Sequence, residues 1–135
     1  MPRHKAKKQI TNLPNFIGYK PEGIHYAKKG SIDLLFEEFH AIDLIDYRDM
    51  NFEQAALAMN ISKTSFARLI QSARKKIATA FIECKSIQAA PGDTYSDYNW
   101  YRCEECFYVA KIKKPNQIDE CPSCQCSKLK NMFEK

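Results

Sequence analysis

The fold is decided by residues 51–80, whose sequence is NFEQAALAMNISKTSFARLIQSARKKIATA. Apolar residues up to Met59 suit one short helix, and from Phe66 onward they follow the three-and-four spacing of a second helix. Between the two, Asn60 tolerates the left-handed conformation that ends a helix, and Ser62 is a preferred N-cap for the next one. A short helix, a tight turn and a capped second helix together predict a helix-turn-helix motif.

The second helix of this motif is the one that we expect to enter the major groove of DNA. Its apolar residues turn inward, so its outer face carries side chains that suit guanine, adenine or phosphate. The alternative is an ordinary helical hairpin whose polar face contacts only water. The predicted DNA-binding residues are Ser62, Lys63, Thr64, Ser65, Ala67, Arg68, Gln71, Ser72, Arg74 and Lys75.

The helices also resemble those of a family of small, uncharacterised prokaryotic proteins. The matching motifs are EFHAIDL at 38–44, Asp46, QAA at 54–56, Met59, Ile61-Ser62, Thr64-Ser65-Phe66 and SARKK at 72–76, preceded by Pro2-Arg3 and Gly18-Tyr19-Lys20-Pro21. The resemblance covers residues 1–88 and implies DNA binding through a helix-turn-helix similar to region 4 of sigma factors. The chain departs from the family at Asn60, where Gly is usual, and in a basic opening that is richer in lysine than in arginine.

Charge is segregated along the 135 residues, whose formal net charge is +5. Residues 1–30 hold seven Lys or Arg and one acid, whereas residues 31–50 hold one Arg and six acids. Residues 51–90 are basic again, with six Lys or Arg and two acids, whereas residues 91–135 hold seven basic and seven acidic residues. Positive charge on the amino-terminal segment and on the recognition helix is what phosphate binding requires.

The segments around the motif complete the expected organisation. Residues 1–30 form a basic arm, either lying along DNA or simply solvated. A helix from Ser31 to about Asp46 buries a stripe of Leu35, Phe39, Ile42 and Ile45. Its polar residues form a solvated face rather than a catalytic or metal site, and they are Glu37, Glu38, His40, Asp43 and Asp46.

The second helix of the motif is expected to run from Lys63 to about Cys84, which is longer than DNA recognition needs. Its carboxyl-terminal half carries an apolar stripe of Ala73, Ile77, Ala80, Phe81 and Cys84. The stripe either packs on the helix before the motif or forms the seam of a homodimer. Residues 31–88 thus make up the helix-turn-helix domain, and residues 89–99, with no periodicity, form a linker.

Residues 100–135 contain two C-x2-C pairs, Cys103 with Cys106 and Cys121 with Cys124. Two-residue spacing lets both thiolates of a pair bind one tetrahedral ion, and the segment between the pairs is long enough for a hairpin. So short a segment cannot bury enough surface to fold unaided, so the metal supplies its core. Cys126 is a spare thiol.

This segment resembles a zinc ribbon and, equally, the iron-binding rubredoxin-type domain found at the end of rubrerythrins. In both families Gly often follows the second Cys of each pair, but this chain has Phe107 and Gln125 at those positions. Four sulfur ligands do not separate zinc from iron. Zinc is the preferred expectation, because no electron-transfer partner is evident in the chain.

Taken together, the sequence predicts a mainly α fold with a small β ribbon that binds zinc or, alternatively, iron. No run of about 18 apolar residues exists to span a membrane, and no apolar stretch follows the basic start as in a secretory signal. We therefore expect a cytoplasmic protein whose cysteines bind metal. The leading hypothesis is a sequence-specific transcriptional regulator that binds double-stranded DNA, with RNA polymerase as a candidate partner; the alternative is an iron redox or electron-transfer module. No enzyme motif is present.

Overall fold

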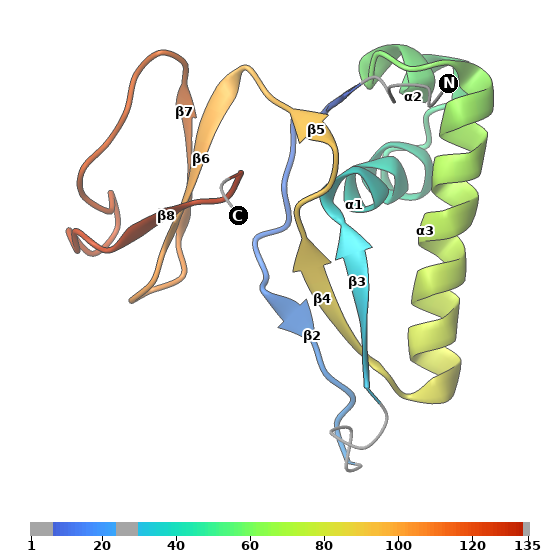
Figure 1. The fold of residues 1–135 in the computed structure, drawn as a ribbon, viewed down its shortest axis with the longest axis horizontal. Helices are drawn as coiled ribbons and strands as arrows, with labels where there is room; N and C mark the ends of the chain where they lie inside the picture. The colour runs from blue at the N-terminus through green and yellow to red at the C-terminus, as the bar shows by residue number, and fades with distance from the viewer. Residues whose placement is uncertain (1–6, 24–29, 134–135) are drawn as a thin grey trace, which may run out of the picture. The chain divides into compact units, whose positions relative to one another are not determined.

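The computed structural model describes residues 7–23 and 30–133 and divides the chain into two compact units, Met1–Tyr95 and Ser96–Lys135 (Figure 1). The boundary falls inside the segment expected to be a linker. The expectation of a mainly α fold is wrong: 33% of the described residues are helical and 25% lie in strands, in three small sheets. None of the helices in the described residues is both long and apolar enough to cross a bilayer.

Two of the four helical segments described in the first unit form the expected pair of helices. These segments are α1 Phe36–Ile42, a π-helical turn η2 Asp43–Tyr47, α2 Phe52–Ala58 and α3 Lys63–Glu83. The side chain of Asn51 accepts a hydrogen bond from the backbone of Gln54, and that of Ser62 accepts one from the backbone of Ser65. Asn60 adopts a left-handed φ of 57°. The two predicted helices, the turn at Asn60 and the Ser62 cap are therefore confirmed.

The helix expected to begin at Ser31 begins five residues later. Residues Ser31–Leu35 form strand β3, which pairs in parallel with β4, Ser86–Ala90, while β2, Gly18–Tyr19, pairs antiparallel with the other edge of β4 (Figure 1). β4 ends at Ala89 and Ala90, which we expected to belong to the irregular linker. Ile32 pairs with Ile87 and Leu34 with Ala89, so a partner far along the chain determines this strand.

Part of the expected arm belongs to this unit. β1, Lys8–Gln9, pairs in parallel with β5, Thr94–Tyr95. Ile10 and Leu13, just after β1, are each only 1% exposed. Residues 1–6 and 24–29 of the arm lie outside the described residues.

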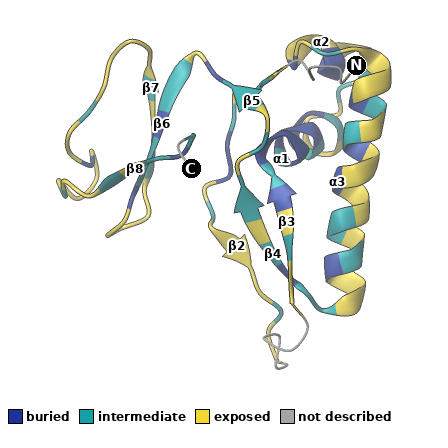
Figure 2. Cartoon of the chain, viewed as in Figure 1, coloured by how far each residue is buried: buried dark blue, intermediate teal, exposed yellow. Residues whose placement is uncertain are grey.

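The polar face expected on the first helix is largely buried (Figure 2). Glu37, Glu38, His40 and Asp43 are all at most 8% exposed, so the expectation of a solvated face is wrong for these four residues. Asp46 alone is exposed as expected. The burial is tolerated because Lys8 lies 3.5 Å from Glu37, and because other cations lie near Glu38 and Asp43.

The second unit is one antiparallel sheet with a metal-binding end. Its strands are β6 Tyr98–Cys103, β7 Val109–Lys113 and β8 Leu129–Asn131, in the order β7-β6-β8. Trp100 on β6 is 4% exposed, and its indole N–H donates to the hydroxyl of Ser96 at 3.1 Å. Around this small core, the loops after β6 and before β8 bring the cysteines together.

Candidate metal centre and nucleic-acid interface

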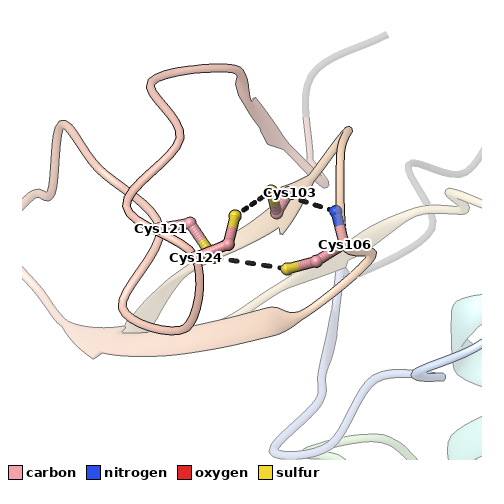
Figure 3. Close-up of side chains that lie close together, drawn as sticks. All are labelled: Cys103, Cys106, Cys121 and Cys124. Carbon is pink, nitrogen blue, oxygen red and sulfur yellow. Dashed lines mark hydrogen bonds between the residues drawn. The ribbon is translucent and has the colours of Figure 1, made fainter.

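The four cysteines of the two C-x2-C pairs converge at one end of the sheet (Figure 3). Their sulfur atoms all lie within 4.8 Å of one another. The Sγ atoms of Cys103 and Cys124 are 3.5 Å apart, and those of Cys106 and Cys121 are 3.6 Å apart. Because zinc–sulfur bonds are about 2.3 Å long, the edges of a tetrahedral four-sulfur site measure roughly 3.8 Å. The cluster therefore fits a single tetrahedral metal ion.

Two matching turns hold the sulfur atoms in place. Cys103 Sγ accepts hydrogen bonds from the backbone of Glu105 at 3.4 Å and of Cys106 at 3.5 Å. The residues that follow the second Cys of each pair, Phe107 and Gln125, adopt left-handed φ angles of 65° and 62°. Zinc ribbons and rubredoxin-type domains often have Gly at these two positions, yet both turns form here with Phe107 and Gln125.

The turn also favours the form of cysteine that binds metal. The pKa of the Cys103 thiol is lowered to about 6, because the backbone N–H groups of Cys106 and Glu105 donate to its sulfur. Metals bind the thiolate, so the Cys103 sulfur is held in the form that can act as a metal ligand near neutral pH. These residues would hold zinc or iron, and the four-sulfur set does not distinguish the two metals.

Cys126 is not part of the cluster. Its carbonyl accepts from the backbone of Cys121 at 2.8 Å, and its sulfur accepts from the backbone of Lys128 at 3.3 Å. The spare thiol thus supports the loop that carries the second pair.

The predicted DNA-binding residues lie on the outer side of α3 and at its cap. Lys63, Arg68 and Gln71 are exposed, whereas Phe66 and Ile70 are buried. Ala67 alone among the predicted residues is half-buried. The exposed members of the set are Ser62, Lys63, Thr64, Ser65, Arg68, Gln71, Ser72, Arg74 and Lys75.

Some of these side chains are engaged within the protein. Ser72 Oγ donates to the carboxylate of Glu38 at 2.7 Å. Arg74 donates to both oxygens of Asp46, at 2.6 and 3.1 Å, and the hydrogen bonding to this carboxylate raises the pKa of Arg74. Among the described residues, five polar side chains of the predicted set make no side-chain hydrogen bond or ion pair: Lys63, Thr64, Arg68, Gln71 and Lys75.

Lys76 has a role that the sequence interpretation missed. Its amine donates to the carboxylate of Glu38 at 2.7 Å and to the carbonyl of Asp33 at 2.9 Å. The available signal was its spacing, because Lys76 lies three residues after buried Ala73 and four before buried Ala80.

Comparison with known proteins gives the family. The family model described as "Protein of unknown function DUF134" matches residues 1–97. The chain belongs to this family. The match ends close to the boundary between the two units, so the family model corresponds to the unit that contains the helix-turn-helix.

Relatives named UPF0251 protein align across both units. A Methanothermobacter thermautotrophicus protein is 33% identical over 124 residues, 92% of this chain and 64% of that relative. A Chloroherpeton thalassium protein is 31% identical over 132 residues, 98% of this chain and 87% of the relative. A Methanococcus maripaludis protein is 37% identical over 112 residues, which are 83% of this chain and 81% of the relative. No solved structure matches the chain significantly.

Proposed function

We propose that the chain is a sequence-specific DNA-binding protein and a transcriptional regulator, with α3 as the helix that enters the major groove. The observation that carries the proposal is the outer face of α3, where Lys63, Arg68 and Gln71 are exposed together. Arg and Lys pair with guanine acceptors, and Gln pairs with adenine. The first-turn side chains of a recognition helix are those that reach base edges.

The anchoring of α3 supports this role. Phe66 and Ile70 hold its first turns on the core, and Phe66 packs edge-on against Phe52 with ring centroids 5.6 Å apart. A recognition helix fixed in this way presents its outer side chains without further ordering, which lowers the entropic cost of binding. Lys75, one turn beyond Gln71, would contact the DNA backbone under this proposal.

The same helix offers a surface for a homodimer. Ala73 and Ala80 pack inward, but Phe81 is 82% exposed and Ile82 is 75% exposed. A second copy covering these side chains would set two recognition helices on one duplex. Sedimentation of the protein would separate a dimer from a monomer. RNA polymerase remains a candidate partner for a regulator of this kind.

The ribbon is proposed to bind structural zinc in a cytoplasmic protein, where thiols stay reduced. Four thiolates leave zinc no open position, which supports a structural rather than a catalytic ion. Iron is the second candidate, because N–H groups donating to Cys103 and Cys121 sulfur atoms also stabilise iron–sulfur sites. A red iron-containing protein would favour a redox role; a colourless zinc protein would favour the structural one.

Selection of preferred sites from random duplex DNA tests the main proposal. A consensus sequence should emerge, and affinity for it should fall steeply with salt, because bound phosphates release counterions. Failure to enrich any sequence, with no binding even at low salt, would overturn it.

A further inference from the structure

The pairing register of the second unit places its charged strand residues on one face of the sheet. In antiparallel pairs, directly opposite residues project to the same face, as do residues two apart along a strand. Tyr98 is opposite Lys113, Trp100 is opposite Lys111, and Arg102 is opposite Lys130. These six side chains, and that of Val109 opposite Arg102, therefore share one face, which we name the basic face: Tyr98, Trp100, Arg102, Val109, Lys111, Lys113 and Lys130.

The opposite face of the same strands carries no charge. Its residues are Asn99, Tyr101, Cys103, Ala110, Ile112, Leu129 and Asn131. Every charged residue of the three strands is thus a cation on the basic face. The acidic residues described in this unit, such as Glu105 and Glu120, lie outside the strands. The second unit is therefore close to neutral as a whole, but the charges of its sheet are all positive and all lie on one face.

The placement of the cations points to an anionic partner. Arg102 and Lys130 stand directly opposite each other, and like charges in that position destabilise a sheet. Lys113 and Lys130 are exposed, and neither is paired with a carboxylate among residues 7–23 and 30–133. The amine of Lys111 lies 4.2 Å from the ring centroid of Tyr98 and 5.3 Å from that of Trp100, which fixes its position on the face.

We propose that the basic face binds the phosphate backbone of duplex DNA, without regard to sequence. The proposal rests on the DNA-binding function proposed for α3 and adds a second contact surface to it. Base stacking is disfavoured, because Lys111 covers the ring of Tyr98 and Trp100 is only 4% exposed. A protein partner would instead be expected to meet exposed apolar anchors at the centre of the patch, and Trp100 is not available as one.

The test compares two double variants of the full-length, metal-loaded protein. Lys113→Gln with Lys130→Gln removes two cations of the basic face. Lys114→Gln with Lys128→Gln removes two exposed cations of the same unit that lie off the strands, where Lys128 is 3.5 Å from Glu105. Binding to duplex DNA is measured by fluorescence anisotropy across a salt series. Metal content and Trp100 fluorescence verify that each variant is folded.

We expect the basic-face variant to make the slope of log affinity against log salt shallower by about two, since each phosphate contact contributes roughly 0.9. The control should keep the wild-type slope, and both variants should keep the preferred sequence. The proposal would be overturned if the salt slope of the basic-face variant is unchanged, or if the slope becomes shallower by the same amount in both variants. The two proposals can fail separately. If the wild type prefers no DNA sequence, but only the basic-face variant has a shallower salt slope, DNA binding by the basic face is supported and sequence recognition by α3 is contradicted.

Discussion

The amine of Lys76 lies 2.7 Å from Oε1 of Glu38, a carboxylate whose side chain is 3% exposed. The same carboxylate accepts from the backbone N–H of Leu35 at 2.9 Å and from the hydroxyl of Ser72 at 2.7 Å. One buried charge therefore caps the start of α1 and binds two successive turns of α3. This network fixes which side of α3 faces inward, and so which side is exposed to solvent.

Replacing Lys76 with Met should destabilise the first unit. The change leaves the Glu38 carboxylate buried without its cation, and the loss of a hydrogen bond to a charged group costs about 1.5 to 3 kcal/mol. Urea unfolding followed by the helical circular dichroism signal measures the change. Lys75→Met is the matched control, because Lys75 is exposed and should shift stability by no more than about 0.5 kcal/mol. Equal effects of the two substitutions would contradict the assigned role of Lys76.

Arg68 and Lys75 should contribute to DNA binding in different ways. Arg68→Ala should cost about 1 to 3 kcal/mol on the preferred sequence and relax discrimination at one base pair. Lys75→Ala should weaken binding to all sequences alike and make the salt slope shallower by about one. Competition binding with preferred and scrambled duplexes checks both. If both variants bind and discriminate like the wild type, the assigned face of α3 is wrong.

Local signals predicted the helix-turn-helix and the cysteine cluster. Ser62 caps α3, and the spacing of the apolar residues predicted where the helix ends. Capping and apolar spacing both depend only on residues that are close in the sequence. The two C-x2-C pairs likewise determine their own geometry. Strand β3 was missed because its partner β4 lies more than 50 residues away, and Ile32 meets Ile87 only in the folded chain.

The buried acids were missed for a related reason. Glu37 and Glu38 look like a solvated pair in the sequence, since carboxylates are rarely buried alone. Lys8 pairs with Glu37 and Lys76 pairs with Glu38, and both lysines come from elements far away in the sequence. No local sequence pattern predicts such ion pairs. The basic face of the ribbon sheet was hidden in the same way, because the register of β6 with β8 determines that Lys130 lies opposite Arg102.

Removal of the metal should unfold the second unit and spare the first. Metal binding supplies the folding free energy of so small a domain. Trp100 is the single tryptophan and lies buried in this unit, so its emission should shift to the red when a chelator is added. The helical circular dichroism signal, which comes from the first unit, should persist. Loss of both signals together would show that the first unit depends on the metal.

Cys121→Ser should abolish metal binding, whereas Cys126→Ser should leave one metal ion per chain. Cys121 is 1% exposed and its sulfur lies in the cluster, while Cys126 lies outside it. Elemental analysis of the two purified variants decides the matter. Retention of the metal by the first variant and its loss from the second would show that the wrong four thiols were assigned.

Gln125→Gly should stabilise the metal-bound ribbon. Gln125 holds a φ of 62°, and a left-handed conformation costs a non-Gly residue about 1 to 2 kcal/mol. Gly relieves this cost but makes the unfolded chain more flexible, so a net gain of roughly 0.5 to 1 kcal/mol is expected. The substitution also removes a long 3.5 Å contact from the Gln125 amide to the carbonyl of Ser123, whose contribution at that distance is small.

Gln117→Gly is the control for this substitution, because Gln117 is exposed in the same unit and is absent from the residues with positive φ. There Gly brings only added flexibility to the unfolded chain, so a loss of about 0.4 to 1 kcal/mol is expected. Urea titration followed by Trp100 emission, at saturating metal, compares the two variants with the wild type. A destabilised Gln125→Gly protein would show that the turn after Cys124 gains more from the Gln side chain than it loses in backbone strain.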